Sequence, residues 1–91
     1  MEYELVPRYD TAKSFYRKAM VITDGNAIRL RSYSTIVAVI YRDEKTITYT
    51  SNDMYSRTTT RHQKEFFKQF GLNDEEVKEI VRGGSLVKDC E

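Results

Sequence analysis

The sequence predicts a single α+β domain, in which a four-stranded antiparallel β-meander carries one main helix on one face and a second, short C-terminal helix beside it. Three observations lead to this prediction. The 91 residues suffice for one domain with one hydrophobic core. Residues 14–50 show the alternation and the short turns of strands. After them, near Thr58, the hydrophobic period changes to that of a helix.

The N-terminal half contains the first two predicted strands. Residues 1–13 form an extended arm, and residues 14–23 are rich in aromatic and β-branched residues that run into an Asp-Gly-Asn turn. We therefore expect the first strand at 14–23. In the following stretch, AIRLRS, the apolar Ile28 and Leu30 alternate with two arginines, which predicts a strand with one face in solvent.

The next two strands complete the predicted meander. Residues 36–41 are apolar at every position, which is typical of a central strand with both faces covered. An Asp-Glu-Lys turn follows, and in the segment TITYT the side chains of Ile47 and Tyr49 are expected to face the core while the threonines face solvent. Short connections of this kind join antiparallel neighbours.

Helical spacing begins after the strands. His62, Phe66 and Phe70 lie four residues apart, which predicts a helix over residues 58–70 that Gly71 ends in a left-handed conformation. Both aromatic side chains are expected to pack against the sheet.

A second helix is predicted over residues 74–82. Asn73 can cap it, and the acidic residues of its first turn suit the positive end of the helix dipole. Residues 83–91 are expected to form a tail, either docked through Leu86 and Val87 or frayed.

Composition excludes several function classes. The formal net charge of +1 differs from the strongly basic balance of most nucleic-acid-binding domains. Cys90 is the only cysteine and His62 the only histidine, so we expect no disulfide within the chain, no metal site and no cofactor. Without a nucleophile elbow, a glycine-rich oxyanion loop or a P-loop, the chain is predicted not to be an enzyme. No signal peptide or spanning segment is recognisable, which favours a cytoplasmic protein with no membrane contact.

Two interpretations fit the start of the first helix. In one, a helix N-terminus with hydroxyls, cations and an imidazole binds a phosphate group, through Arg57, Thr58, Thr59, Arg61 and His62. In the other, which we favour, these residues are structural. Ser56 or Thr58 then caps the helix, Arg61 and Glu65 form a surface ion pair, and His62 packs in the core.

A second candidate surface combines basic and aromatic residues on the outer face of the sheet and in the loops. Such a surface is used by proteins that bind single-stranded nucleic acid, and tyrosines are frequent in protein interfaces. A solvated sheet face has the same composition, and we favour that interpretation for the strand arginines. The interface candidates are Tyr16, Arg29, Arg31, Tyr33 and Tyr55.

Three segments, SFYRKAMV, SYSTIVAV and YSRTTTRHQKEFFKQFG, occur here in the order found in a known family. They resemble small uncharacterised proteins of bacteriophages and prophages whose motif reads Tyr-Ser-x-Thr-Thr-x-Arg-His-x-x-Glu-Phe-x-x-Gln. The residues that fill the motif are Tyr55, Ser56, Thr58, Thr59, Arg61, His62, Glu65, Phe66 and Gln69. The resemblance covers residues 9–72 and implies a phage or mobile-element origin. It also implies a partner class, because small phage proteins often bind and disable a host protein or defence system.

These observations together predict a non-catalytic binding protein that engages a host macromolecule, most simply a protein, through the sheet or the tyrosine-bearing loops. The alternative is a nucleic-acid or phosphorylated-nucleotide binder at residues 58–62. The sequence does not decide between a monomer and a homodimer, because an uncovered edge strand could pair two copies or be shielded by the N-terminal arm.

Overall fold

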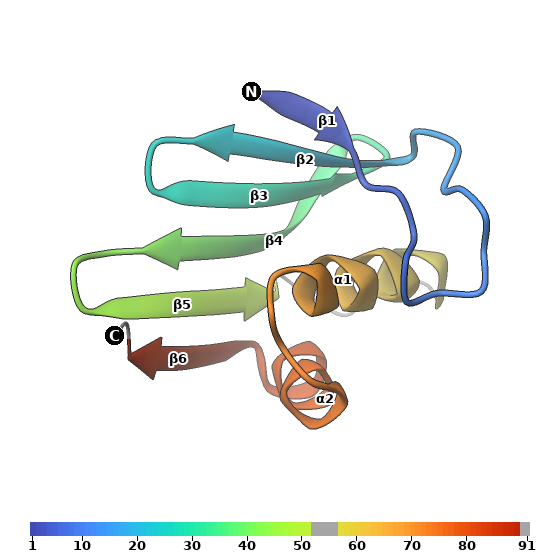
Figure 1. The fold of residues 1–91 in the computed structure, drawn as a ribbon. Helices are drawn as coiled ribbons and strands as arrows, with labels where there is room; N and C mark the ends of the chain where they lie inside the picture. The colour runs from blue at the N-terminus through green and yellow to red at the C-terminus, as the bar shows by residue number, and fades with distance from the viewer. Residues whose placement is uncertain (52–56, 90–91) are drawn as a thin grey trace.

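The structure is a computed structural model and describes residues 1–51 and 57–89. It is an α+β fold in which two helices accompany a six-stranded antiparallel sheet (Figure 1). The elements in chain order are β1 (Glu2–Glu4), β2 (Ala19–Asp24), β3 (Ala27–Ser32), β4 (Thr35–Arg42), β5 (Thr46–Ser51), α1 (Arg57–Gln69), α2 (Asp74–Gly83) and β6 (Ser85–Asp89). Each strand pairs with the next one in the chain, and both helices lie in the connection between β5 and β6.

The predicted α+β class and antiparallel sheet are confirmed, whereas the predicted number of four strands is wrong. The two additional strands are the sheet edges. β1 lies within the predicted arm and pairs with β2, and β6 lies within the predicted tail and pairs with β5. With lengths of 3 and 5 residues, these strands are too short to show a clear period, and pairing with a neighbour stabilises them.

The first predicted strand, residues 14–23, begins too early. Its N-terminal part is a β-turn closed by a hydrogen bond of 3.0 Å from the Lys18 N–H to the Phe15 carbonyl. Tyr16 and Arg17, the central residues, have φ of 54° and 63°. Positive φ at both central positions is typical of a type I′ turn, and β2 begins only after it.

The hydrophobic core lies between one face of the sheet and the two helices. The prediction that phenylalanines of the first helix pack against the sheet is confirmed, since Phe66 and Phe67 have 0% exposure. The largest apolar side chains with less than 2% exposure are Phe66, Phe67, Leu5, Leu30, Ile80, Val21, Val37 and Val77. Leu5 belongs to the connection between β1 and β2, so this segment is part of the core as well.

The opposite face of the sheet is not covered by either helix. The register pairs Arg29 with Ile22 and Val39, so these side chains share the outer face. The predicted alternation in β3 is thereby confirmed, and that in β5 is confirmed because Tyr49 lies in the core and Ile47 packs against it. The prediction that both faces of residues 36–41 are covered is wrong. Both helices lie on the inner face of the sheet, and Tyr41 is 50% exposed.

The end of α1 and the start of α2 follow the predicted capping. α1 begins and ends one residue before the predicted limits, and Gly71 has the expected left-handed conformation, with φ of 100°. Asn73 and Glu76 form a reciprocal capping box, with hydrogen bonds of 2.9 and 3.0 Å between the side chain of each and the backbone N–H of the other. This rigid corner fixes α2 beside α1.

Candidate functional site

One flank of α1 holds the connection between β1 and β2, which spans residues 5–18 (Figure 1). The carboxylate of Glu65 accepts three successive backbone N–H groups, from Arg8 at 3.0 Å, Tyr9 at 2.9 Å and Asp10 at 2.8 Å. Glu65 is only 2% exposed. A run of N–H groups that converges on an anion in this way gives strong, charge-assisted hydrogen bonds. Glu65 therefore fixes this connection against the helix.

Arg61 and Gln69 extend the same row of α1 at a spacing of four residues. Gln69 Nε2 donates to the Val6 carbonyl at 2.7 Å, and Arg61 Nε donates to Asp10 Oδ2 at 3.0 Å. The hydrogen bond from Arg61 lowers the pKa of Asp10 from 3.8 to about 2. The predicted surface pair between Arg61 and Glu65 is therefore wrong, since each has its partner in the connection. The sequence spacing predicts that these residues share one row of the helix, but it does not show that this row contacts the β1–β2 connection.

A buried polar cluster lies on the inner side of the same helix. His62 is 1% exposed, its Nδ1 lies 2.8 Å from Ser32 Oγ, and the ring of Phe15 packs 4.5 Å from the imidazole. Ser32 Oγ also lies 3.4 Å from Thr59 Oγ1. Burial, followed by the charge of Arg61, lowers the pKa of His62 and favours the neutral imidazole. The prediction that His62 is a packed, hydrogen-bonded core residue is confirmed.

This geometry determines which phosphate-site candidates can reach a ligand. Thr59 and His62 are buried, and the guanidinium of Arg61 is engaged by Asp10. Of the five, only Arg57 and Thr58 are exposed and have no such partner among the residues that the structure describes. Of the two predicted caps, Thr58 lies inside the first turn of α1, which begins at Arg57, so Thr58 is not the cap. Ser56, the other predicted cap, and the interface candidate Tyr55 lie outside the described residues.

Two turns bring exposed tyrosines together at one end of the sheet. Tyr16 is 77% and Tyr33 53% exposed. Tyr33, in the turn between β3 and β4, donates its backbone N–H to the Lys18 carbonyl at 2.7 Å, and Lys18 Nζ lies 5.7 Å from the centre of the Tyr33 ring. We call Tyr16, Arg17, Lys18 and Tyr33 the tyrosine surface. The sequence predicted both tyrosines as interface candidates but did not single out Arg17.

Two side-chain acceptors hold the backbone of the tyrosine surface in place. Ser14 Oγ accepts the Tyr16 N–H at 2.8 Å, and the Glu4 carboxylate accepts the Arg17 N–H at 3.2 Å. Both residues are thereby kept at positive φ, and Tyr33 also has a positive φ, of 58°. Non-glycine residues adopt this region at a steric cost. The turn is therefore strained and at the same time well determined.

The strand arginines are separate from the tyrosine surface in their chemistry, because both have carboxylate partners. Arg31 forms an ion pair with Glu2, and Arg29 lies 3.8 Å from Asp24. These pairs reduce the positive charge of the outer face. The arrangement agrees with the favoured interpretation of a solvated sheet surface.

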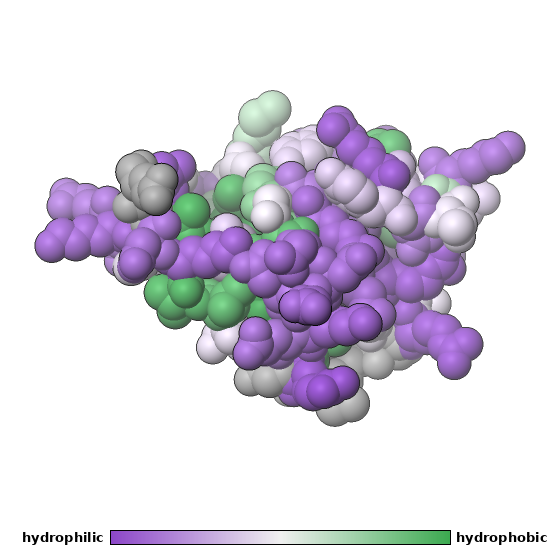
Figure 2. Space-filling model, turned by 60° about the horizontal axis from the view of Figure 1, so that its bottom comes forward, coloured by the Kyte–Doolittle hydropathy of each residue, from purple (hydrophilic) through white to green (hydrophobic). Residues whose placement is uncertain are grey.

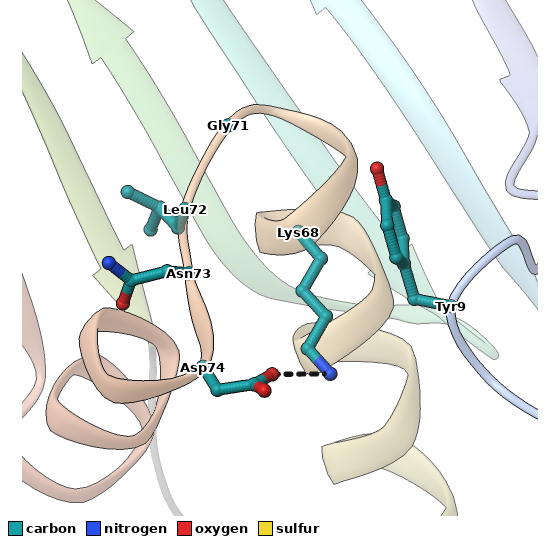
Figure 3. A pocket seen from close by; sticks show the side chains of 6 residues that line it. All are labelled: Tyr9, Lys68, Gly71, Leu72, Asn73 and Asp74. Atoms are coloured by element: carbon teal, nitrogen blue, oxygen red, sulfur yellow. Dashed lines mark ion pairs between the residues drawn. The ribbon is translucent and has the colours of Figure 1, made fainter.

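A shallow hollow lies where α1 ends, with a volume of about 490 Å³ (Figure 3). Lys68 lies between Tyr9 and Asp74, and its Nζ is 2.8 Å from the Asp74 carboxylate. Gly71, Leu72 and Asn73 complete the lining. Because Asp74 already satisfies the lysine, this hollow offers no unpaired charge to a ligand.

Within residues 1–51 and 57–89, no group of three or more His, Cys, Asp or Glu side chains is arranged to hold a metal ion. In this same part of the chain, neither helix is long and apolar enough to cross a membrane.

Comparison with known proteins gave one family match. The model of a family of unknown function, DUF8033, matches residues 3–82, which include all elements from β2 to the body of α2. No curated protein and no solved structure matched the chain.

Proposed function

The chain belongs to the DUF8033 family of unknown function, and we propose that it is a non-catalytic binding protein that engages another protein through the tyrosine surface. The observation that supports this proposal most is the type I′ turn with tyrosine and arginine at both positive-φ positions. Asn-Gly is the usual pair there, because these residues adopt left-handed conformations with little strain. A large side chain at such a position costs roughly 1–2 kcal/mol.

Strain of this kind gathers at functional sites, where the side chain matters more than the conformational cost. The tyrosine surface contains residue types that contribute most of the binding energy in protein interfaces, namely tyrosine and arginine. Tyr16 makes few burying contacts within its own protein, since the residue is 77% exposed. Contact with a partner would therefore bury apolar ring surface that folding leaves in water.

The class of partner follows from the resemblance to phage proteins, which makes a host protein, including a defence protein, the partner we propose. Inhibition or modulation of that protein would need no chemistry beyond surface contact. A cytoplasmic location in the host cell is part of the same proposal.

Affinity capture from bacterial lysate tests this function. The tagged protein is compared with the double variant Tyr16→Asn/Tyr33→Asn, because asparagine tolerates positive φ and removes only the ring. Tyr41→Thr is the matched control, since Tyr41 is similarly exposed, at 50%, but lies at the other end of β4. Each lysate is used with and without nuclease treatment.

We expect a discrete protein to be retained by the wild type and by the control after nuclease treatment, and to be lost from the double variant. Retention of the same protein by all three would reject the tyrosine surface. Retention of nucleic acid alone, with steep salt dependence and loss in an Arg57→Gln variant, would instead favour binding at the start of α1.

A further inference from the structure

A groove runs between the two helices on the flank of α1 that does not hold the β1–β2 connection. Its volume is about 390 Å³. Thr60 and Lys64 line it from α1, one helical turn apart, and Lys78, Val81 and Arg82 line it from α2 at positions i, i+3 and i+4. Hydrophilic residues cover most of the side on which α2 lies, and hydrophobic residues reach the surface in a limited area between them (Figure 2).

Among the described residues that line this groove, every charged one is a cation. Lys64, Lys78 and Arg82 are exposed, and none has an ion-pair partner within residues 1–51 and 57–89. Other cations of the helical layer are paired, as Lys68 is with Asp74. These three cations have no close ion-pair partner in that part of the chain, so they can attract a carboxylate, although Glu75 and Glu79 adjoin Lys78 and Arg82 in the neighbouring hollow.

The lining between the cations is apolar. Val81 is half-buried and packs against the core, so its exposed part forms a fixed apolar surface. An occupant that matches both properties has carboxylates at its sides and an apolar side chain at its centre. Such complementarity of charge and shape is what gives protein interfaces their specificity.

We propose that the α1–α2 groove binds an acidic segment of a partner protein, with an apolar side chain over Val81 and flanking carboxylates on Lys64, Lys78 and Arg82. This surface lies on the other flank of α1 from the contacts of the β1–β2 connection and does not depend on the tyrosine surface. Nucleic acid fits less well because, among residues 1–51 and 57–89, no aromatic side chain lines the groove for base stacking.

Fluorescence anisotropy with a defined probe tests this proposal. The probe is a short fluorescein-labelled peptide in which aspartates and glutamates flank one leucine, and its amide counterpart carries asparagines and glutamines instead. The variant Lys78→Gln/Arg82→Gln removes two exposed cations of the groove. The matched control Arg42→Gln/Lys45→Gln removes two exposed cations near the turn between β4 and β5.

We expect the acidic peptide to bind and its amide counterpart to bind far more weakly, with an affinity loss of about tenfold or more in the groove variant and little change in the control. A second variant, Val81→Thr, should weaken the leucine peptide but not the same peptide with serine in place of leucine. Circular dichroism confirms that each variant is folded. The proposal is overturned if the acidic peptide does not bind, if both double variants lose affinity equally, or if single-stranded DNA binds more tightly than the peptide.

Discussion

Replacement of Glu65 by glutamine tests whether this carboxylate fixes the β1–β2 connection. The substitution keeps the shape of the side chain and turns one acceptor oxygen into an NH₂ donor. The carboxylate is 2% exposed and accepts bonds from three backbone N–H groups, of Arg8, Tyr9 and Asp10. It also accepts one at 2.6 Å from Gln69 Nε2.

The size of the effect follows from these contacts. If the new NH₂ group replaces Oε1, it faces the N–H groups of Tyr9 and Asp10, and if it replaces Oε2, it faces those of Arg8 and Gln69. Either orientation opposes two donors, and the two remaining bonds lose the assistance of the charge. Hydrogen bonds to charged groups contribute about 1.5–3 kcal/mol each and neutral ones about 1, so the lower values give an expected loss of about 4 kcal/mol. For a domain of this size that corresponds to a fall in Tm of roughly 16–32 °C.

Urea and thermal unfolding, followed by circular dichroism, measure this loss. Glu44→Gln in the exposed turn between β4 and β5 is the control, because it removes the same charge without removing a hydrogen bond. Its unfolding free energy should change by less than about 0.5 kcal/mol. A loss below about 1 kcal/mol for Glu65→Gln would refute the idea that the connection depends on this carboxylate.

Three further predictions concern the turn, the buried histidine and the helix cap. The double substitution Tyr16→Asn/Arg17→Gly should raise the unfolding free energy in urea by about 1–2 kcal/mol, because it relieves the strain of the left-handed conformation. The same substitution should abolish partner binding. Unchanged stability would show that the turn is not strained. Burial lowers the pKa of His62 in the folded protein, so, as the pH falls, the unfolded chain binds this proton before the folded chain does. The unfolding free energy should therefore be full above pH 6.5, the ordinary pKa of histidine, and decline as the pH falls below it. His62→Gln should flatten this decline in urea midpoints, and an unchanged slope would contradict a buried neutral imidazole. Asn73→Ala should cost about 1 kcal/mol in thermal unfolding through loss of the capping box, and a variant as stable as wild type would show that the cap contributes nothing.

Local patterns were enough to predict the parts of the fold that depend on nearby residues. The alternation in β3 and β5, the spacing of Phe66 in α1 and the Asn73 cap of α2 each involve side chains within a few positions of one another. Such periodicities follow from the geometry of a single strand or helix and need no knowledge of its partner. The packing of His62 could be predicted for the same reason, since it shares a helical face with phenylalanine.

The candidate site was harder to predict because its parts are distant in sequence. The tyrosines at 16 and 33 could be named from composition, but their turns meet through a backbone hydrogen bond between Tyr33 and Lys18. The α1–α2 groove likewise combines Lys64 with Lys78 and Arg82 only after the two helices pack together. No local pattern marks either surface.

By itself, therefore, the sequence determined the α+β class, the central strands, both helices, the Gly71 end of α1 and the Asn73 cap of α2, because hydrophobic period and capping chemistry act over a few residues. Only the tertiary structure decided the two edge strands, the strained turn and the role of Glu65. Edge strands as short as β1 and β6 gain most of their order from the neighbour they pair with. Tyrosine and arginine carry no preference for a left-handed turn, and the N–H groups that meet Glu65 lie 55–57 residues away. These features depend on long-range contacts, which form only when the whole chain packs around one core.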